Sequence, residues 1–166
     1  MDDIGIPGML INTLEVSFIY MGTSYKGKYT PKNPNKYAGD PSKIIYRSLW
    51  ERKFMVFCDE TASVLKWSSE EISIPYFSPI DHEYHQYYPD FVIKVKDKTN
   101  QIKTYVIEIK PEKQCREPEK KNKSDKTYLT EMSQWVINNK KWEAAKKFAD
   151  RQQWEFKILT EKTLNL

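Results

Sequence analysis

The chain has 166 residues, a formal net charge of +4 and two cysteines. This length suffices for one domain with a buried core, and the modest positive charge permits a polyanionic partner without requiring one. Cys58 and Cys115 lie far apart in no metal-binding pattern, which argues against a structural zinc site and favours reduced thiols. No stretch approaches the roughly 20 apolar residues of a membrane span, and Asp2 and Asp3 stand where a signal peptide is basic. We therefore expect a soluble protein that stays inside the cell that makes it.

Residues 1–40 are expected to be an extension and basic arm, followed by a domain over residues 41–166. Residues 1–24 alternate weakly in TLEVSFIYM, which leaves two interpretations: a strand that pairs with the domain, or an arm that docks on a partner. Residues 25–40 are basic and interrupted by proline and glycine, so they are expected to be an extended arm with no helix or strand. Lysines interleaved with tyrosines suit contact with a nucleic-acid backbone, and a solvated tether is the alternative.

Two amphipathic helices are predicted. The first is expected to begin after Asp40, a capping residue, with Pro41 in its first turn, and to run to about Asp59 on an apolar stripe of period 3.6. The second is expected over residues 129–153, after a Lys/Glu-rich loop at residues 112–127.

Four strands are predicted between and after these helices. Three of them cover residues 70–77, 87–95 and 103–110, and the fourth covers residues 154–160. The turn residues of KDKTNQ indicate that the second and third strands form a hairpin. The resulting order, α-β-β-β-α-β, predicts an α+β fold in which helices flank a small mixed sheet.

The strand YVIEIKP carries two charges among apolar residues. Alternation along a strand places Glu108 and Lys110 on one face at its end. In the predicted hairpin Asp90 begins the neighbouring strand and lies opposite both. Two carboxylates about 4 Å apart repel by roughly 4 kcal/mol at an effective dielectric near 20, and a divalent cation offsets this directly. The alternative is a solvent-facing strand end with an ordinary salt bridge.

These residues resemble the PD-(D/E)XK nucleases, whose motif is matched by Pro89-Asp90 and Glu108-Ile109-Lys110. That superfamily has an αβββαβ core, and its first helix usually carries another acid, which is Glu51 here. Residues 26–162 are also similar to a narrower group, the head-completion nucleases of T-even-like tailed phages. A more remote resemblance is to the endonuclease subunit of heteromeric bacterial transposases. The resemblance implies a nuclease domain at residues 41–166.

The resemblance also implies a DNA endonuclease that depends on Mg²⁺ or Mn²⁺ and leaves a 5′-phosphate and a 3′-hydroxyl. Asp90, Glu108 and the carbonyl of Ile109 would bind the metal, which lowers the pKa of a bound water. Lys110 would position or deprotonate that water or stabilise the charge of the transition state. Glu51 would complete the metal shell or hold its waters.

Several further residues have a weaker signal. For Glu51 the alternative is a helix-surface pair with Arg47 or with the nearby Arg52. Glu71, or its neighbour Glu70, and Gln134 are candidate accessory residues, with a solvated turn and an exposed helix surface as their alternatives. The pair in HEYH indicates a surface loop rather than a zinc site. Basic residues expected to contact DNA phosphates are Lys26, Lys28, Lys32, Lys36, Lys43, Arg47, Lys113 and Arg116.

The function expected from the resemblance is completion of phage heads by processing DNA ends after packaging, so that a neck or tail can attach. Recognition is expected through the DNA backbone, an end or a branched shape, because no base-reading element is evident. The partners would be DNA and the portal or neck proteins of the head, in the host cytoplasm during assembly or in the virion. A structural head or neck protein without turnover is the alternative from another class, and a transposase-subunit or junction-resolving nuclease is the third.

Overall fold

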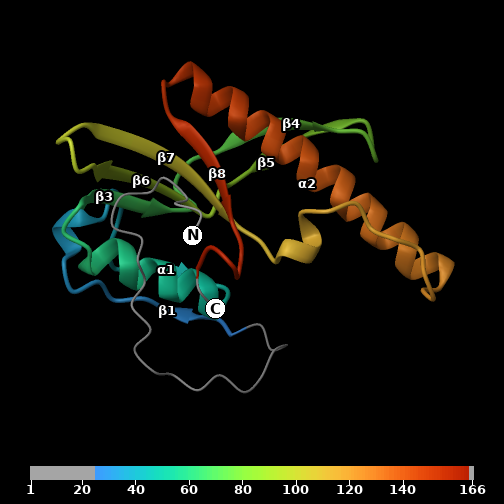
Figure 1. Cartoon of the computed structure of the whole chain (residues 1–166), viewed down its shortest axis with the longest axis horizontal. Coiled ribbons are helices and arrows are strands. Elements are labelled where there is room, and N and C mark those ends of the chain that lie inside the picture. The colour runs from blue at the N-terminus through green and yellow to red at the C-terminus, as the bar shows by residue number, and fades with distance from the viewer. Residues whose placement is uncertain (1–24, 165–166) are drawn as a thin grey trace.

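The computed structural model describes residues 25–164 (Figure 1). The predicted pairing or docking of TLEVSFIYM lies outside these residues. No helix among those described is both long and apolar enough to cross a membrane.

In chain order the elements are β1 (Gly27–Lys28), a 3-10 helix (Pro34–Lys36), β2 (Ile45–Tyr46), α1 (Leu49–Glu60), β3 (Val64–Ser69), β4 (Ile74–Ser78), β5 (Glu83–Tyr87), β6 (Phe91–Lys96), β7 (Ile102–Ile109), a 3-10 helix (Glu112–Gln114), α2 (Asp125–Arg151) and β8 (Glu155–Leu159).

A mixed sheet of four strands, in the order β3-β6-β7-β8, forms the centre of the molecule. β3, β6 and β7 are antiparallel, and β8 joins β7 in parallel after the crossover that α2 provides. The predicted α+β fold is confirmed, and so is the hairpin of β6 and β7. Its turn forms because the Asp97 carboxylate accepts hydrogen bonds from the backbone N–H groups of Thr99, at 2.8 Å, and Gln101, at 2.9 Å.

The strand predicted at residues 70–77 is present in part as β4, but it does not belong to the central sheet, whose first strand is β3. β4 instead pairs with β5 in a separate two-stranded sheet. A register shift between Val64 and Lys66 interrupts the alternation of β3, which hides this strand from a period-two pattern. HEYH lies at the surface as predicted, but the predicted loop is wrong, since Glu83–Tyr87 is a strand.

The start predicted for the first helix is wrong as well. Asp40 accepts hydrogen bonds from the backbone N–H and hydroxyl of Ser42, at 3.0 and 2.7 Å, so its side chain closes a local turn rather than capping a helix. β2 follows and pairs with β1, which gives the basic arm a strand as well as a 3-10 helix. α1 begins at Leu49 and is capped by Ser48. α2 begins at Asp125, ahead of its predicted start, where Ser124 caps it.

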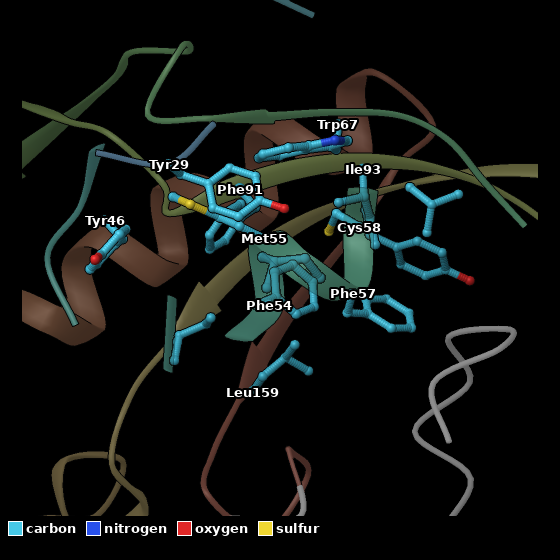
Figure 2. Close-up of a cluster of buried hydrophobic side chains, with 14 of the residues drawn as sticks. Tyr29, Tyr46, Phe54, Met55, Phe57, Cys58, Trp67, Phe91, Ile93 and Leu159 are labelled. Carbon is cyan, nitrogen blue, oxygen red and sulfur yellow. The ribbon is translucent and has the colours of Figure 1, made fainter. Parts of the chain in front are cut away.

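Both faces of the central sheet are covered, with α1 on one side and α2 on the other (Figure 1). On the α1 side, Phe54 contacts Phe91 with ring centroids 4.8 Å apart, in a cluster that includes Trp67 (Figure 2). On the α2 side, Ala145 packs against residues of the β4–β5 hairpin, including Tyr87. As a result, β7 is buried on both faces from residue 105 to residue 109. A carboxylate in that stretch requires compensation by nearby groups.

The basic arm is held to the domain by the buried side chain of Asp59, which is 1% exposed. Its carboxylate accepts hydrogen bonds from the Tyr29 hydroxyl at 3.1 Å and from the backbone N–H groups of Lys32 and Asn33 at 2.7 and 3.0 Å. The ammonium of Lys36 donates to the carbonyls of Asp59 and Thr61, at 2.7 and 2.8 Å, at the C-terminal end of α1. The arm is therefore part of the fold from Tyr29 onward.

Candidate active site

The β6–β7 register brings Asp90 to the end of β7. Phe91 pairs with Ile107, so the residue before β6 reaches the level of Glu108 and Ile109. Asp90 Oδ2 accepts a hydrogen bond of 2.6 Å from the Ile109 N–H, and the Asp90 carbonyl accepts one of 3.3 Å from the Glu70 N–H. Contacts to both neighbouring strands thus fix Asp90 at one end of the sheet.

Glu108 lies in β7 and Lys110 directly follows this strand, and the two side chains form a close pair on one face. Glu108 is 3% exposed, and its Oε1 lies 2.9 Å from Lys110 Nζ. Its other oxygen, Oε2, accepts a short hydrogen bond from the Tyr87 hydroxyl. A solvent-facing strand end with an ordinary salt bridge does not describe this pair, because the carboxylate is buried.

The electrostatics of the site follow from two carboxylates held together, Glu108 buried and Asp90 half-buried. Burial raises the pKa of Asp90 well above its ordinary value, and the charge of Glu108 raises it further. Burial lowers the pKa of Lys110, but the attraction of Glu108 and Asp90 outweighs this, so the pKa is raised and the amine stays cationic. Additional positive charge, from a proton or a divalent cation, would therefore stabilise the carboxylate pair.

The donor set fits Mg²⁺ or Mn²⁺. Asp90 and Glu108 offer hard carboxylate oxygens, and the Ile109 carbonyl follows Glu108 directly in the sequence. Asp90 Oδ1 has no hydrogen-bond partner among residues 25–164. Each Glu108 oxygen has one hydrogen-bond or ion-pair partner, and a carboxylate oxygen carries a second lone pair. One or two carboxylates with waters and a phosphate are the usual environment of Mg²⁺ in proteins.

Glu51 faces this pair from the N-terminus of α1, and its charge acts on both Asp90 and Lys110. Its carboxylate is already used in a capping box: it accepts hydrogen bonds from the Arg47 N–H at 2.7 Å and the Ser48 hydroxyl at 2.9 Å. The alternative of a side-chain pair with Arg47 is wrong, because the Arg47 guanidinium binds Glu70 at 3.0 and 2.8 Å. A role for Glu51 beside the metal stays a prediction.

The carboxylates of Glu51, Asp90 and Glu108 do not all lie within 4.8 Å of one another. Within the described part of the chain, Asp81, Glu83 and His85 on the exposed β4–β5 hairpin do meet that distance. There the two side chains Asp81 and His85 satisfy each other at 2.7 Å. Exposed groups of this kind are common without an ion, so we assign no metal site to them.

The two accessory candidates have other partners. Glu71 accepts a hydrogen bond of 2.9 Å from the Tyr37 hydroxyl, and the exposed Gln134 donates one of 2.9 Å to Asn138. No hydrogen bond or ion pair links either side chain to Asp90 or Glu108 among residues 25–164. Their accessory roles remain predictions that the contacts do not favour.

The basic residues expected to bind DNA fall into two groups. Lys26, Lys28 and Lys43 line a surface pocket beside the β1–β2 ribbon, and Lys43 also pairs with Asp40 at 3.1 Å. Lys32 pairs with Glu60 at 2.6 Å, and Lys36 caps α1 as described above. The first group is thus better placed for a ligand than the second.

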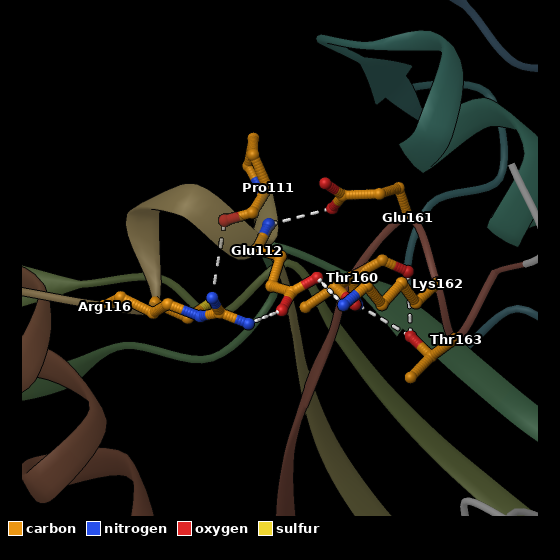
Figure 3. Close-up of polar contacts among 8 residues, drawn as sticks. Pro111, Glu112, Arg116, Thr160, Glu161, Lys162 and Thr163 are labelled. Atoms are coloured by element: carbon orange, nitrogen blue, oxygen red, sulfur yellow. Dashed lines mark hydrogen bonds and ion pairs between the residues drawn. The ribbon is translucent and has the colours of Figure 1, made fainter. Parts of the chain in front are cut away.

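In the loop after β7, Lys113 is exposed, whereas Arg116 pairs with Glu112 (Figure 3). The same carboxylate pairs with Lys162 at 2.6 Å, and the Glu112 N–H donates to Glu161 at 2.8 Å. These contacts tie the loop to the segment after β8. Arg116 therefore has a structural partner, and Lys113 keeps its exposed charge.

Sequence reasoning missed Tyr87, which reaches the site through its hydroxyl. Burial raises the pKa of this phenol, and the charge of Glu108 raises it further, so Tyr87 donates its proton in the hydrogen bond to Glu108. In the sequence Tyr87 is one of several tyrosines before Pro89. Only the pairing of β4 with β5, which the pattern did not predict, shows where its ring points.

Two comparisons with known proteins show what the chain is similar to. A family model described as "TnsA-like endonuclease N terminal" matches residues 61–161. The chain is also similar to the head completion nuclease of Enterobacteria phage T4, at 39% identity over 142 residues, which cover 83% of this chain and 92% of that protein. The family match includes Asp90 and residues 108–110, and it begins after Glu51.

Proposed function

Since the chain belongs to the TnsA-like endonuclease N-terminal family, we propose that it is a DNA endonuclease dependent on Mg²⁺ or Mn²⁺. The observation that carries the proposal is the pairing of the half-buried Asp90 with the buried Glu108, whose Oε1 lies 2.9 Å from Lys110 Nζ. Two acids and a fixed cation held together in this way suit phosphodiester hydrolysis.

Each residue has a role that its contacts support. Asp90, Glu108 and the Ile109 carbonyl would hold the metal, which when bound lowers the pKa of a water and withdraws charge from the phosphate. Lys110, kept cationic by Glu108, orients the attacking water or stabilises the charge that develops on the phosphoryl oxygens. The Tyr87 hydroxyl keeps the Glu108 carboxylate in place through the hydrogen bond that it donates to Glu108 Oε2.

We further propose that the substrate is DNA in a phage head. The support is the similarity to a head completion nuclease over 92% of that protein's length. Processing of DNA ends after packaging would then allow a neck or tail to attach, with portal or neck proteins as partners. Contacts to the DNA backbone would come first from Lys26, Lys28 and Lys113, whose charges are exposed.

A structural head or neck protein without turnover is the second candidate. The observation in its favour is that Glu108 and Glu51 have protein partners for all of their oxygens. A carboxylate satisfied in this way does not require a metal. This candidate predicts no affinity for Mg²⁺ or Mn²⁺ and no cleavage.

The two are separated by offering the protein linear, circular and branched DNA with Mg²⁺, Mn²⁺ or EDTA. Lys110→Gln is compared with Lys103→Gln, an exposed lysine of the same strand that pairs with Glu155 at 3.7 Å. We expect metal-dependent cutting by the wild type and Lys103→Gln, and a loss of about 100-fold or more in Lys110→Gln. Equal cutting by all three proteins indicates a contaminating nuclease, and no cutting with no metal binding supports the structural candidate.

A further inference from the structure

A second lysine, Lys141 of α2, lies next to the candidate active site. Its Nζ is 5.6 Å from the ring centroid of Tyr76 and 5.9 Å from that of Tyr87. Tyr87 is the residue whose hydroxyl binds Glu108. Lys141 is therefore separated from the carboxylate pair by one aromatic ring, and the charges of Lys110, Glu108 and Asp90 all act on it.

Lys141 has no anionic partner among residues 25–164. Its neighbours on α2 are different: Lys140 and Lys147 pair with Glu143 at 3.0 and 2.8 Å. Burial lowers the pKa of Lys141, and repulsion by Lys110 lowers it further. A half-buried ammonium held only by ring faces is costly to keep charged, and an anion arriving at this position would relieve that cost.

A purely structural role explains this arrangement poorly. A cation over an aromatic ring at a partly exposed site contributes only about 0.5–1 kcal/mol, so this contact alone does not explain why Lys141 lies near Lys110. The carboxylates of Asp90 and Glu108 attract Lys141 only while their charges are uncompensated. A divalent cation on that pair would cancel the attraction and leave Lys141 facing positive charge alone.

We propose that Lys141 binds a non-bridging oxygen of a backbone phosphate in the DNA strand that lies at the Asp90–Glu108 pair. The inference rests on the proposed function. Lys110 then acts on the water and the reacting phosphate, while Lys141 holds the strand from the α2 side. The ammonium of Lys141 lies beside the rings of Tyr76 and Tyr87, and the Tyr87 hydroxyl in turn donates to Glu108, so the charge is held close to the site.

The test uses three variants of the full chain. Lys141→Met removes the charge but keeps an apolar chain over the two rings, Lys141→Arg keeps the charge, and Lys140→Met is the matched control on the same helix. DNA affinity is measured with Ca²⁺ in place of Mg²⁺ at several salt concentrations, and cleavage is measured with Mg²⁺. We expect Lys141→Met to weaken binding about tenfold and to reduce the slope of log K against log salt by about one. Lys141→Arg should restore most of both, and Lys140→Met should change neither.

An unchanged salt slope in a folded Lys141→Met protein overturns the inference, and a lowered melting temperature as its sole effect assigns Lys141 to the fold. Lys141→Gln replaces Lys141→Met if the latter does not fold. If the wild type cleaves DNA and Lys141→Met has the same salt slope as the wild type, this inference fails and the proposed function stands. A wild type that neither binds DNA nor cuts it with metal defeats the proposed function and this inference together.

Discussion

Two aspartates, Asp59 near the end of α1 and Asp90 just before β6, show how the same residue type serves two purposes. Asp59, at the end of α1, accepts hydrogen bonds from Tyr29, Lys32 and Asn33 and faces no other carboxylate in these contacts. Asp90, before β6, accepts one from the Ile109 N–H and faces Glu108. A buried acid surrounded by donors stabilises the fold, whereas a half-buried acid beside another acid leaves a site ready for a cation.

Replacing each aspartate tests this contrast, and the largest effect is expected at Asp90. Asp90→Asn removes one negative charge from the metal ligands and should lower DNA cleavage about 1,000-fold, or roughly 4 kcal/mol in the barrier. The same change relieves repulsion with Glu108, so the metal-free protein should melt at a higher temperature. Cleavage assays and thermal unfolding measure the two effects. A variant that cuts DNA at the wild-type rate would remove Asp90 from the reaction.

At Asp59 we expect the opposite signs. Asp59→Ala leaves buried donors unsatisfied and detaches the arm, which should lower the free energy of unfolding by about 3 kcal/mol. Mn²⁺ affinity at a temperature where the variant is still folded should stay close to that of the wild type, because Asp59 is not among the proposed ligands. Urea unfolding and calorimetric titration with Mn²⁺ at low temperature check these two statements. Stability equal to the wild type would show that the arm is not held through this carboxylate.

The parts that could be predicted from the sequence are those in which local chemistry and long-range order agree. The hairpin of β6 and β7 has its own turn, formed by Asp97, and the two strands carry Asp90 and Glu108 at facing ends. Periodicity predicted both helices and the strands β6, β7 and β8, but it missed β3 and β5 and did not separate β4 from the central sheet. For these reasons the fold class and the proximity of the two acids could be inferred without coordinates.

The remainder depends on contacts that a pattern does not contain. A register shift disguises β3, and the side chain of Asp40 satisfies a turn that resembles a helix cap. Tyr87 and Lys141 acquire their positions only when the β4–β5 hairpin packs against α2. A tyrosine at position 87 or a lysine at position 141 fits ordinary core or surface equally well, so neither predicts a functional site.

Tyr87 belongs to both the core and the candidate site, and the effect of replacing it should be smaller than that of replacing either aspartate. Tyr87→Phe keeps the ring in the core but removes the hydrogen bond that orients Glu108. Groups that orient a metal ligand typically affect metal affinity by about 10–100-fold, and we expect a weakening of that size for Mn²⁺. Calorimetry measures it, with Tyr76→Phe as the control, since Tyr76 contacts Lys141 but is not the Glu108 donor. Equal weakening in both variants would point to packing rather than the hydroxyl.

The smallest effect expected is a pH dependence carried by Asp90. The pKa of this carboxyl is raised above its ordinary value of 3.8, first by burial and then by Glu108, so the folded metal-free protein binds a proton more readily than the unfolded chain. Its contribution to stability is therefore greatest at low pH and is lost as the pH rises from the ordinary value through the raised one.

A metal must displace that proton, so Mn²⁺ affinity should rise by up to about tenfold per pH unit within this window, or roughly 1.4 kcal/mol. Calorimetric titrations in buffers of different ionisation enthalpy measure the proton released with the metal. Asp59→Asn should show the wild-type dependence, because its carboxylate is not among the proposed ligands. Affinity that is flat across the window would mean that Asp90 is already ionised without metal. The contrast between the two aspartates would then rest on geometry alone.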